Sequence, residues 1–143
     1  LPLGDHERLM RNLREAEQLA ESIGDLRRVG LVQSNLGMTL WLSGQNAAAL
    51  EMTQKALAIA TRLGNEALAL GTMFNLGMIH HALGEYGRAI EVHAEILPAL
   101  TGARESQRMN WGGYPGVFVR TFLAQSCLEL GRTDEAADYV AYG

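Results

Sequence analysis

Ser34-Asn35-Leu36-Gly37-Met38 and Phe74-Asn75-Leu76-Gly77-Met78 are two copies of one short pattern, and the second begins 40 residues after the first. The same step joins Gly4 to Gly44 and Gly44 to Gly84. When several separate positions follow one period, the chain contains an internal repeat, and the repeat decides the fold before any other feature. A third copy follows after a longer step of 47 residues, with Leu123-Ala124 at the Leu-Gly position.

Each copy is predicted to form a helix, a tight turn and a second helix. Apolar residues recur at helical spacing from Leu36 to Leu42 and again from Ala49 to Leu63. Glycine follows both runs, and glycine in that place is a signal for the end of a helix. We expect seven helices, at about residues 5–23, 26–43, 46–63, 66–83, 86–100, 115–130 and 133–141.

Three prolines and one insertion modify the predicted boundaries of the helices and repeats. Pro98 is expected to end the fifth helix early, because proline cannot donate to the carbonyl one turn back. Pro115 suits the first turn of the sixth helix, and Leu1-Pro2-Leu3-Gly4 reads as the end of a preceding helix. The longer step to the third copy places an insertion at 101–116, and Trp111 predicts that it is ordered against the repeats.

Small residues recur where neighbouring helices must come close. Glycine inside a helix costs about 1 kcal/mol relative to alanine. A glycine repeated in register therefore predicts a helix–helix contact that compensates for this cost. The small residues stand midway along the first helix of each unit, at Gly37, Gly77 and Ala124, and early in the second helix, at Ala49, Ala89 and Ala136.

The second copy resembles the tetratricopeptide repeat, whose pattern is W-x2-L-G-x2-Y followed by A-x3-F. It reads Met73-x2-Leu76-Gly77-x2-His80, then Ala89-x3-His93. The small residues match this pattern and the large aromatics do not, and the period is longer than the usual repeat of about 34 residues. The resemblance implies an all-α fold, a right-handed α-solenoid of tetratricopeptide-like helical hairpins with about seven helices.

The long repeat is also similar to the C-terminal repeat regions of bacterial adenylate/guanylate cyclase–predicted ATPase signalling proteins. This resemblance implies a non-catalytic interaction, scaffold or sensor module of a larger protein, since no catalytic motif of those parents lies in these residues. Residues 1–143 then form one domain cut from that protein, with a partial unit at 1–25 and units at 26–65, 66–105 and 115–143. The segments that carry the resemblance include Leu13-Arg14-Glu15-Ala16-Glu17, Gln54-Lys55-Ala56-Leu57-Ala58 and Cys127-Leu128-Glu129-Leu130-Gly131.

Composition and charge argue against several classes of function. The net charge of −4 offers no basic footprint for nucleic acid, and no apolar run is long enough to span a bilayer. The single Cys127 favours a reducing cytoplasm, and its place on an apolar helix face predicts a buried, inert thiol. Lys55 lies mid-helix without a glycine-rich loop, so no nucleotide cofactor is expected. His80 and His81 diverge by about 100° on one helix, so no metal site is expected either, and no residue is assigned a catalytic role.

The first helix of each unit lines the concave groove in solenoids of this type. Aromatic and methionine side chains make that surface apolar, so we expect it to bind an apolar peptide or protein segment. In the alternative, the chain itself covers these side chains and the repeats form a structural spacer or oligomerisation unit without a ligand. The resemblance places ten residues in the groove: Ser34, Met38, Trp41, Phe74, Asn75, Met78, His81, Phe118, Thr121 and Gln125.

The two ends of the chain lack the polar caps that solenoids normally carry. The first helix has an apolar face with Leu9, Leu13, Leu19 and Ile23, and only one neighbouring helix is available to cover it. Large exposed apolar patches promote association, and pairing of like surfaces about a two-fold axis is the simplest form that it takes. We therefore expect the chain to self-associate.

Overall fold

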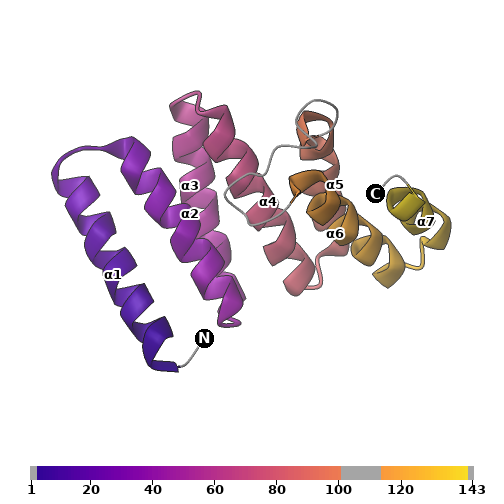
Figure 1. Cartoon of the computed structure of the whole chain (residues 1–143), viewed down its shortest axis with the longest axis horizontal. Helices are drawn as coiled ribbons and strands as arrows, with labels where there is room; N and C mark the ends of the chain where they lie inside the picture. Colours follow the sequence, from indigo (N-terminus) through magenta and orange to yellow (C-terminus); the bar gives the residue numbers. More distant parts are fainter. Residues whose placement is uncertain (1–2, 101–113, 142–143) are drawn as a thin grey trace. The chain divides into compact units, whose positions relative to one another are not determined.

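The computed structural model describes residues 3–100 and 114–141, and the regular structure in these ranges is entirely helical. Seven α-helices in this part of the chain confirm the predicted number, and their ends agree with the predicted ends to within a few residues. The prediction for the inserted segment falls largely on residues 101–113, which lie outside the described residues. In chain order (Figure 1) the elements are α1 (Leu3–Ser22), α2 (Leu26–Leu42), α3 (Asn46–Arg62), α4 (Glu66–Ala82), α5 (Tyr86–Ile96), η1 (Leu97–Leu100), α6 (Pro115–Glu129) and α7 (Thr133–Ala141).

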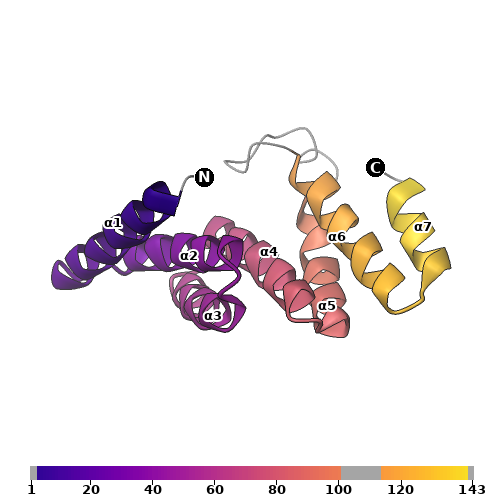
Figure 2. The same ribbon diagram turned by 90° about the horizontal axis from the view of Figure 1, so that it is seen from below.

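The chain divides into two compact units, Leu1–Asn75 and Leu76–Gly143, and the division falls inside α4. In the first unit α1 packs on α2 and α2 packs on α3, so each helix contacts its neighbour in sequence. In the second unit α5 packs on α6 and α6 on α7, and Figure 2 shows α6 and α7 as a hairpin joined by a short turn. Consecutive packing of this kind is that of a helical repeat protein.

Glycines in the left-handed conformation end the helices, as the sequence predicts. After α2, the amide of Gly44 donates to the carbonyl of Trp41 (2.9 Å) and the amide of Gln45 donates to that of Leu40 (2.9 Å). This is the Schellman arrangement, which satisfies the last carbonyls of the helix. Positive φ angles between 59° and 76° occur at five such glycines, Gly24, Gly44, Gly64, Gly84 and Gly131.

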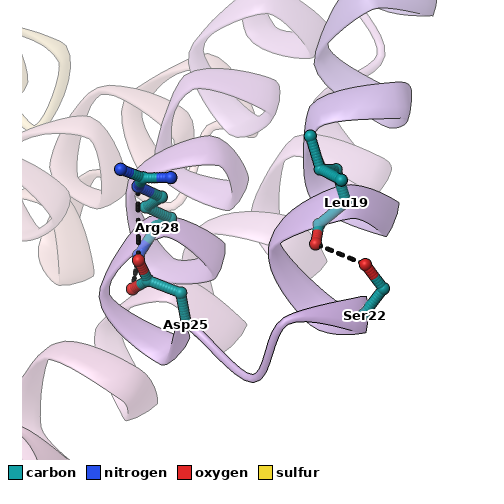
Figure 3. A network of polar contacts seen from close by, with 4 residues as sticks. All are labelled: Leu19, Ser22, Asp25 and Arg28. Carbon is teal, nitrogen blue, oxygen red and sulfur yellow. Dashed lines mark hydrogen bonds and ion pairs between the residues drawn. The ribbon is translucent and has the colours of Figure 1, made fainter.

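The turn between α1 and α2 is closed by side chains as well (Figure 3). Asp25 caps α2, because its Oδ1 accepts a hydrogen bond from the amide of Arg28 (3.0 Å). The Arg28 guanidinium returns to the same carboxylate at 3.2 Å, and Ser22 Oγ donates to the carbonyl of Leu19 (2.7 Å). An aspartate at this position satisfies a helix amide that would otherwise lack a partner.

Two of the three predictions about helix ends are confirmed, and one is wrong. Pro98 lies in a 3-10 turn after α5, which ends at Ile96, and Pro115 is the first residue of α6. Gly4 was expected to end a preceding helix in step with Gly44 and Gly84, but it lies in the first turn of α1. A glycine accepts the helical conformation as readily as the left-handed one, so the period alone does not decide between them.

Candidate functional site

The predicted groove residues of α2 are partly exposed. Ser34, Met38 and Trp41 all lie between the buried and the exposed state. Ser34 also joins α2 to α4, since Asn75 Nδ2 donates to its Oγ (3.3 Å) and Thr72 Oγ1 donates to the same atom (3.4 Å). Hydrogen bonds between helices fix their register, so this part of the predicted groove is held in place by polar contacts.

The predicted groove residues of α4 lie in two different environments. Phe74, Asn75 and Met78 are only 5%, 8% and 4% exposed, and the Asn75 amide is occupied by Ser34. His81, one turn nearer the end of the helix, is partly exposed. Of these residues, only His81 presents appreciable surface to a ligand.

The predicted groove residues of α6 are the most accessible. Phe118 is 42% exposed, and Thr121 and Gln125 are exposed too. The sequence reasoning missed Val117, which is 45% exposed beside Phe118. Thr121 Oγ1 donates to the carbonyl of Val117 (2.8 Å), which occupies its hydroxyl proton and leaves its methyl group as part of the surface. Helix α6 therefore carries an exposed apolar stripe with polar residues along it.

His81 is fixed by three residues from two neighbouring helices of the second unit, α5 and α6. Its Nδ1 lies 2.9 Å from Ser126 Oγ on α6. Its ring meets the edge of Tyr86 on α5 at a centroid distance of 5.1 Å and that of Phe122 on α6 at 6.0 Å. The sequence analysis missed Ser126 and Phe122, and the available signal was a small polar residue within the apolar run of α6.

The neighbouring His80 has a different and local role. It is 5% exposed, and its Nδ1 lies 2.6 Å from Glu85 Oε2 at the turn into α5. The two histidines thus have separate partners, as their divergence on the helix predicts. Within residues 3–100 and 114–141, no group of three or more His, Cys, Asp or Glu side chains could hold a metal ion.

Cys127 is fully buried on α6. Burial raises the pKa of its thiol, and the positive charge of Arg132 opposes this only in part. A raised pKa lowers the thiolate fraction, and the thiolate is the reactive form. This agrees with the prediction of an inert structural thiol.

The helices of the described ranges are also too short or too polar to be membrane spans, and none qualifies as one. The longest of them is α1, which contains charged residues throughout its length. A transmembrane helix needs about 20 predominantly apolar residues.

Two family models match the chain. A model described as tetratricopeptide repeat matches residues 28–101, which is just over half of the 143 residues. A second model of the same description matches residues 117–138. A search of curated proteins found no significant match. The two matched ranges contain all ten of the predicted groove residues.

Proposed function

Because this chain belongs to the tetratricopeptide repeat family, we propose that it is a protein-interaction module that binds an apolar peptide or protein segment on first helices of its repeats. Repeats of this family serve as interaction or scaffold surfaces. The module is non-catalytic in this proposal and acts in the cytoplasm as part of a larger bacterial signalling protein linked to a cyclase or a regulatory ATPase.

The observation that carries this proposal is the exposed stripe on α6. Val117 and Phe118 remain 45% and 42% exposed on a helix whose opposite face, at Val119 and Leu123, is fully buried. Exposed aromatic and aliphatic side chains beside polar ones are typical of binding surfaces, where a few anchors supply most of the affinity. Phe118 is the anchor expected to contribute most.

The structural-spacer alternative is favoured by a different observation. Phe74 and Met78 are almost fully buried, so a ligand cannot reach them without a rearrangement of their surroundings. If α4 is only a packing element, the ligand surface is restricted to α6 and the neighbourhood of His81. The two alternatives therefore differ in whether the α6 stripe binds anything.

The test is a screen of the whole chain against a library of short random peptides. We expect enrichment of peptides with aromatic and aliphatic residues, and we expect Phe118→Ala to weaken their binding by about 2 kcal/mol, or roughly thirtyfold. Val117→Ala should weaken binding as well, and Val140→Ala is its matched control. Val140 is 68% exposed but lies on α7, a second helix of a repeat.

Circular dichroism should show that all three variants keep the helical content of the unmodified chain, because each changes an exposed side chain. A chain that enriches no peptides would exclude the interaction proposal and leave the spacer. Equal weakening by Val117→Ala and Val140→Ala would show that binding is not specific to the first helices.

Self-association is a further part of the proposal, supported by the exposed side of α1 and α2. Leu19, Ile23 and Leu31 are 64%, 58% and 42% exposed, and they line a shallow cavity of about 280 Å³ in the first unit. We expect concentration-dependent sedimentation of the chain, and we expect Leu19→Glu to abolish it. A monomer at all concentrations would contradict this part of the proposal only.

A further inference from the structure

The imidazole of His81 is the most constrained polar group on the accessible part of the predicted groove. Tyr86 and Phe122 hold its ring by edge contacts, and Ser126 holds its Nδ1. Ser126 itself is fully buried. A ring fixed on three sides presents its remaining nitrogen, Nε2, in one direction, and no hydrogen bond to Nε2 is present within the described ranges.

The buried hydroxyl of Ser126 decides which nitrogen of His81 carries the proton. A neutral imidazole has one donor and one acceptor nitrogen. In the part of the chain that the structure describes, the only hydrogen-bond contact of Ser126 Oγ is with His81. A buried hydroxyl that fails to donate loses free energy. Donation by Ser126 to Nδ1 avoids this loss, and in that arrangement the proton of His81 lies on Nε2, where it can be donated to a ligand.

The His81 ring lies against Phe122, which is on the side of α6 that carries the apolar stripe. Gln125 and Phe118 are three residues after and four residues before Phe122, so they share its side of the helix. The stripe and the imidazole thus form a surface with apolar groups and one directed donor. Such a surface can bind an apolar segment and fix its orientation with one directed hydrogen bond.

We propose that His81 fixes the position of the bound ligand by donating a hydrogen bond from Nε2 to a backbone carbonyl oxygen of an extended peptide segment on α6. This inference rests on the proposed function. The ligand is extended rather than helical, because the carbonyls inside a helix already accept hydrogen bonds from their own chain. Ser126 is a positioning residue in this scheme, since it acts through the His81 tautomer.

The first experiment measures the tautomer directly in the whole chain. Long-range ¹H–¹⁵N correlation spectra of the neutral imidazole, recorded at alkaline pH, should show the proton of His81 on Nε2. Ser126→Ala should shift the tautomer ratio away from this form. A proton on Nδ1 in the unmodified chain would overturn the inference, whatever peptides bind.

The second experiment uses a peptide enriched in the library screen, with each backbone amide replaced in turn by an ester. An ester carbonyl is a weaker acceptor, so one position should lose affinity in the unmodified chain. His81→Phe keeps an aromatic ring but removes the donor, and we expect it to weaken binding about threefold to tenfold, the range for one neutral hydrogen bond. In His81→Phe, replacing that same amide by an ester should no longer lower the affinity of the peptide.

His80→Phe is the matched control, because His80 is adjacent, buried and bound to Glu85. It should leave peptide affinity unchanged. His81→Gln, whose amide can still donate, should recover part of the affinity lost in His81→Phe and guards against a folding defect. Peptides that bind His81→Phe as well as the unmodified chain would overturn this inference alone, whereas a chain that binds no peptide overturns the proposed function with it.

Discussion

The hairpin of α2 and α3 and the hairpin of α4 and α5 place a glycine at the same step of the repeat against different partners. A Cβ atom added to Gly37 would overlap with Thr53 Oγ1 and lie 3.3 Å from the carbonyl oxygen of Ala49. A Cβ atom added to Gly77 would overlap with three ring atoms of His93. Thr53 and His93 are both fully buried. The same sequence signal therefore stands for a contact with a small hydroxyl in one hairpin and with a rigid ring in the other.

This difference shows that the glycine and its partner form one unit of packing. Glycine costs about 1 kcal/mol in a helix relative to alanine, and the close approach of the neighbouring helix offsets that cost in both hairpins. The size and stiffness of the partner decide how much a substitution at the glycine lowers the free energy of unfolding.

The largest effect is expected from Gly77→Ala, which should lower the free energy of unfolding by about 2–3 kcal/mol. The His93 ring is buried and cannot bend away from an added methyl group. Urea unfolding of the two chains measures the change. In a His93→Ala background the same substitution should cost much less, and an undiminished cost there would contradict the proposed contact.

Gly37→Ala should be milder, with a loss of about 1–2 kcal/mol. Its clash is with a hydroxyl, which is smaller than a ring, although the nearby carbonyl of Ala49 limits relaxation. In a Thr53→Ala background the intrinsic preference of alanine for helix should appear, and Gly37→Ala should become neutral or stabilising by up to about 1 kcal/mol. A Gly37→Ala effect as large as that of Gly77→Ala would remove the distinction between the hairpins.

Gly44→Ala and Gly84→Ala should each cost about 1 kcal/mol. Both glycines have positive φ angles, of 75° and 76°, and among the described residues no atom beyond the adjoining ones lies within 4 Å of an added Cβ. The cost is therefore purely conformational and should be equal in the two hairpins. Unequal values in urea unfolding would show that the turns, and not only the crossing points, differ.

The smallest effect concerns charges on the second helices. Lys55 lies one turn after Glu51 and donates to its carboxylate at 2.6 Å, while the equivalent pair 40 residues later is Glu91 and Glu95. The hydrogen bond and charge of Lys55 lower the pKa of Glu51. The resulting stabilisation is complete above the ordinary carboxyl pKa and is lost as the pH falls through the lowered value.

An NMR titration of Glu51 should show the lowered pKa, and Lys55→Gln should return it towards the ordinary value. Because both side chains are solvent-exposed, the change in melting temperature should be slight. Glu95→Lys would build the missing pair on α5 and should raise the melting temperature slightly. A fall in melting temperature would show that Glu95 already makes a more stabilising interaction than the new pair.

Most of the fold was predictable from local signals. The repeat period, the glycines after apolar runs, and Pro98 and Pro115 placed every helix end to within a few residues, because each signal acts on a few residues of backbone. Gly4 was the exception, since a glycine by itself permits both a turn and a helix. The buried Cys127 also followed from its place on an apolar helix face.

The candidate site was predictable only as a set of positions on the first helices. Ser34, Phe74 and Phe118 were all placed in the groove from their register, yet Ser34 joins two helices, Phe74 is buried and Phe118 is exposed. Periodicity states which side of a helix a residue occupies. It does not state how closely other segments cover that side.

The sequence by itself determined that this protein is a series of helical hairpins, and it determined where each helix ends, because helix formation and termination depend on neighbours within a turn or two along the chain. Only the tertiary structure decided which partner each repeated glycine meets, and that His81 pairs with Ser126 from 45 residues away. Those contacts join segments whose spacing in the sequence carries no local signal, and they depend on how the facing side chains fill the space between packed helices.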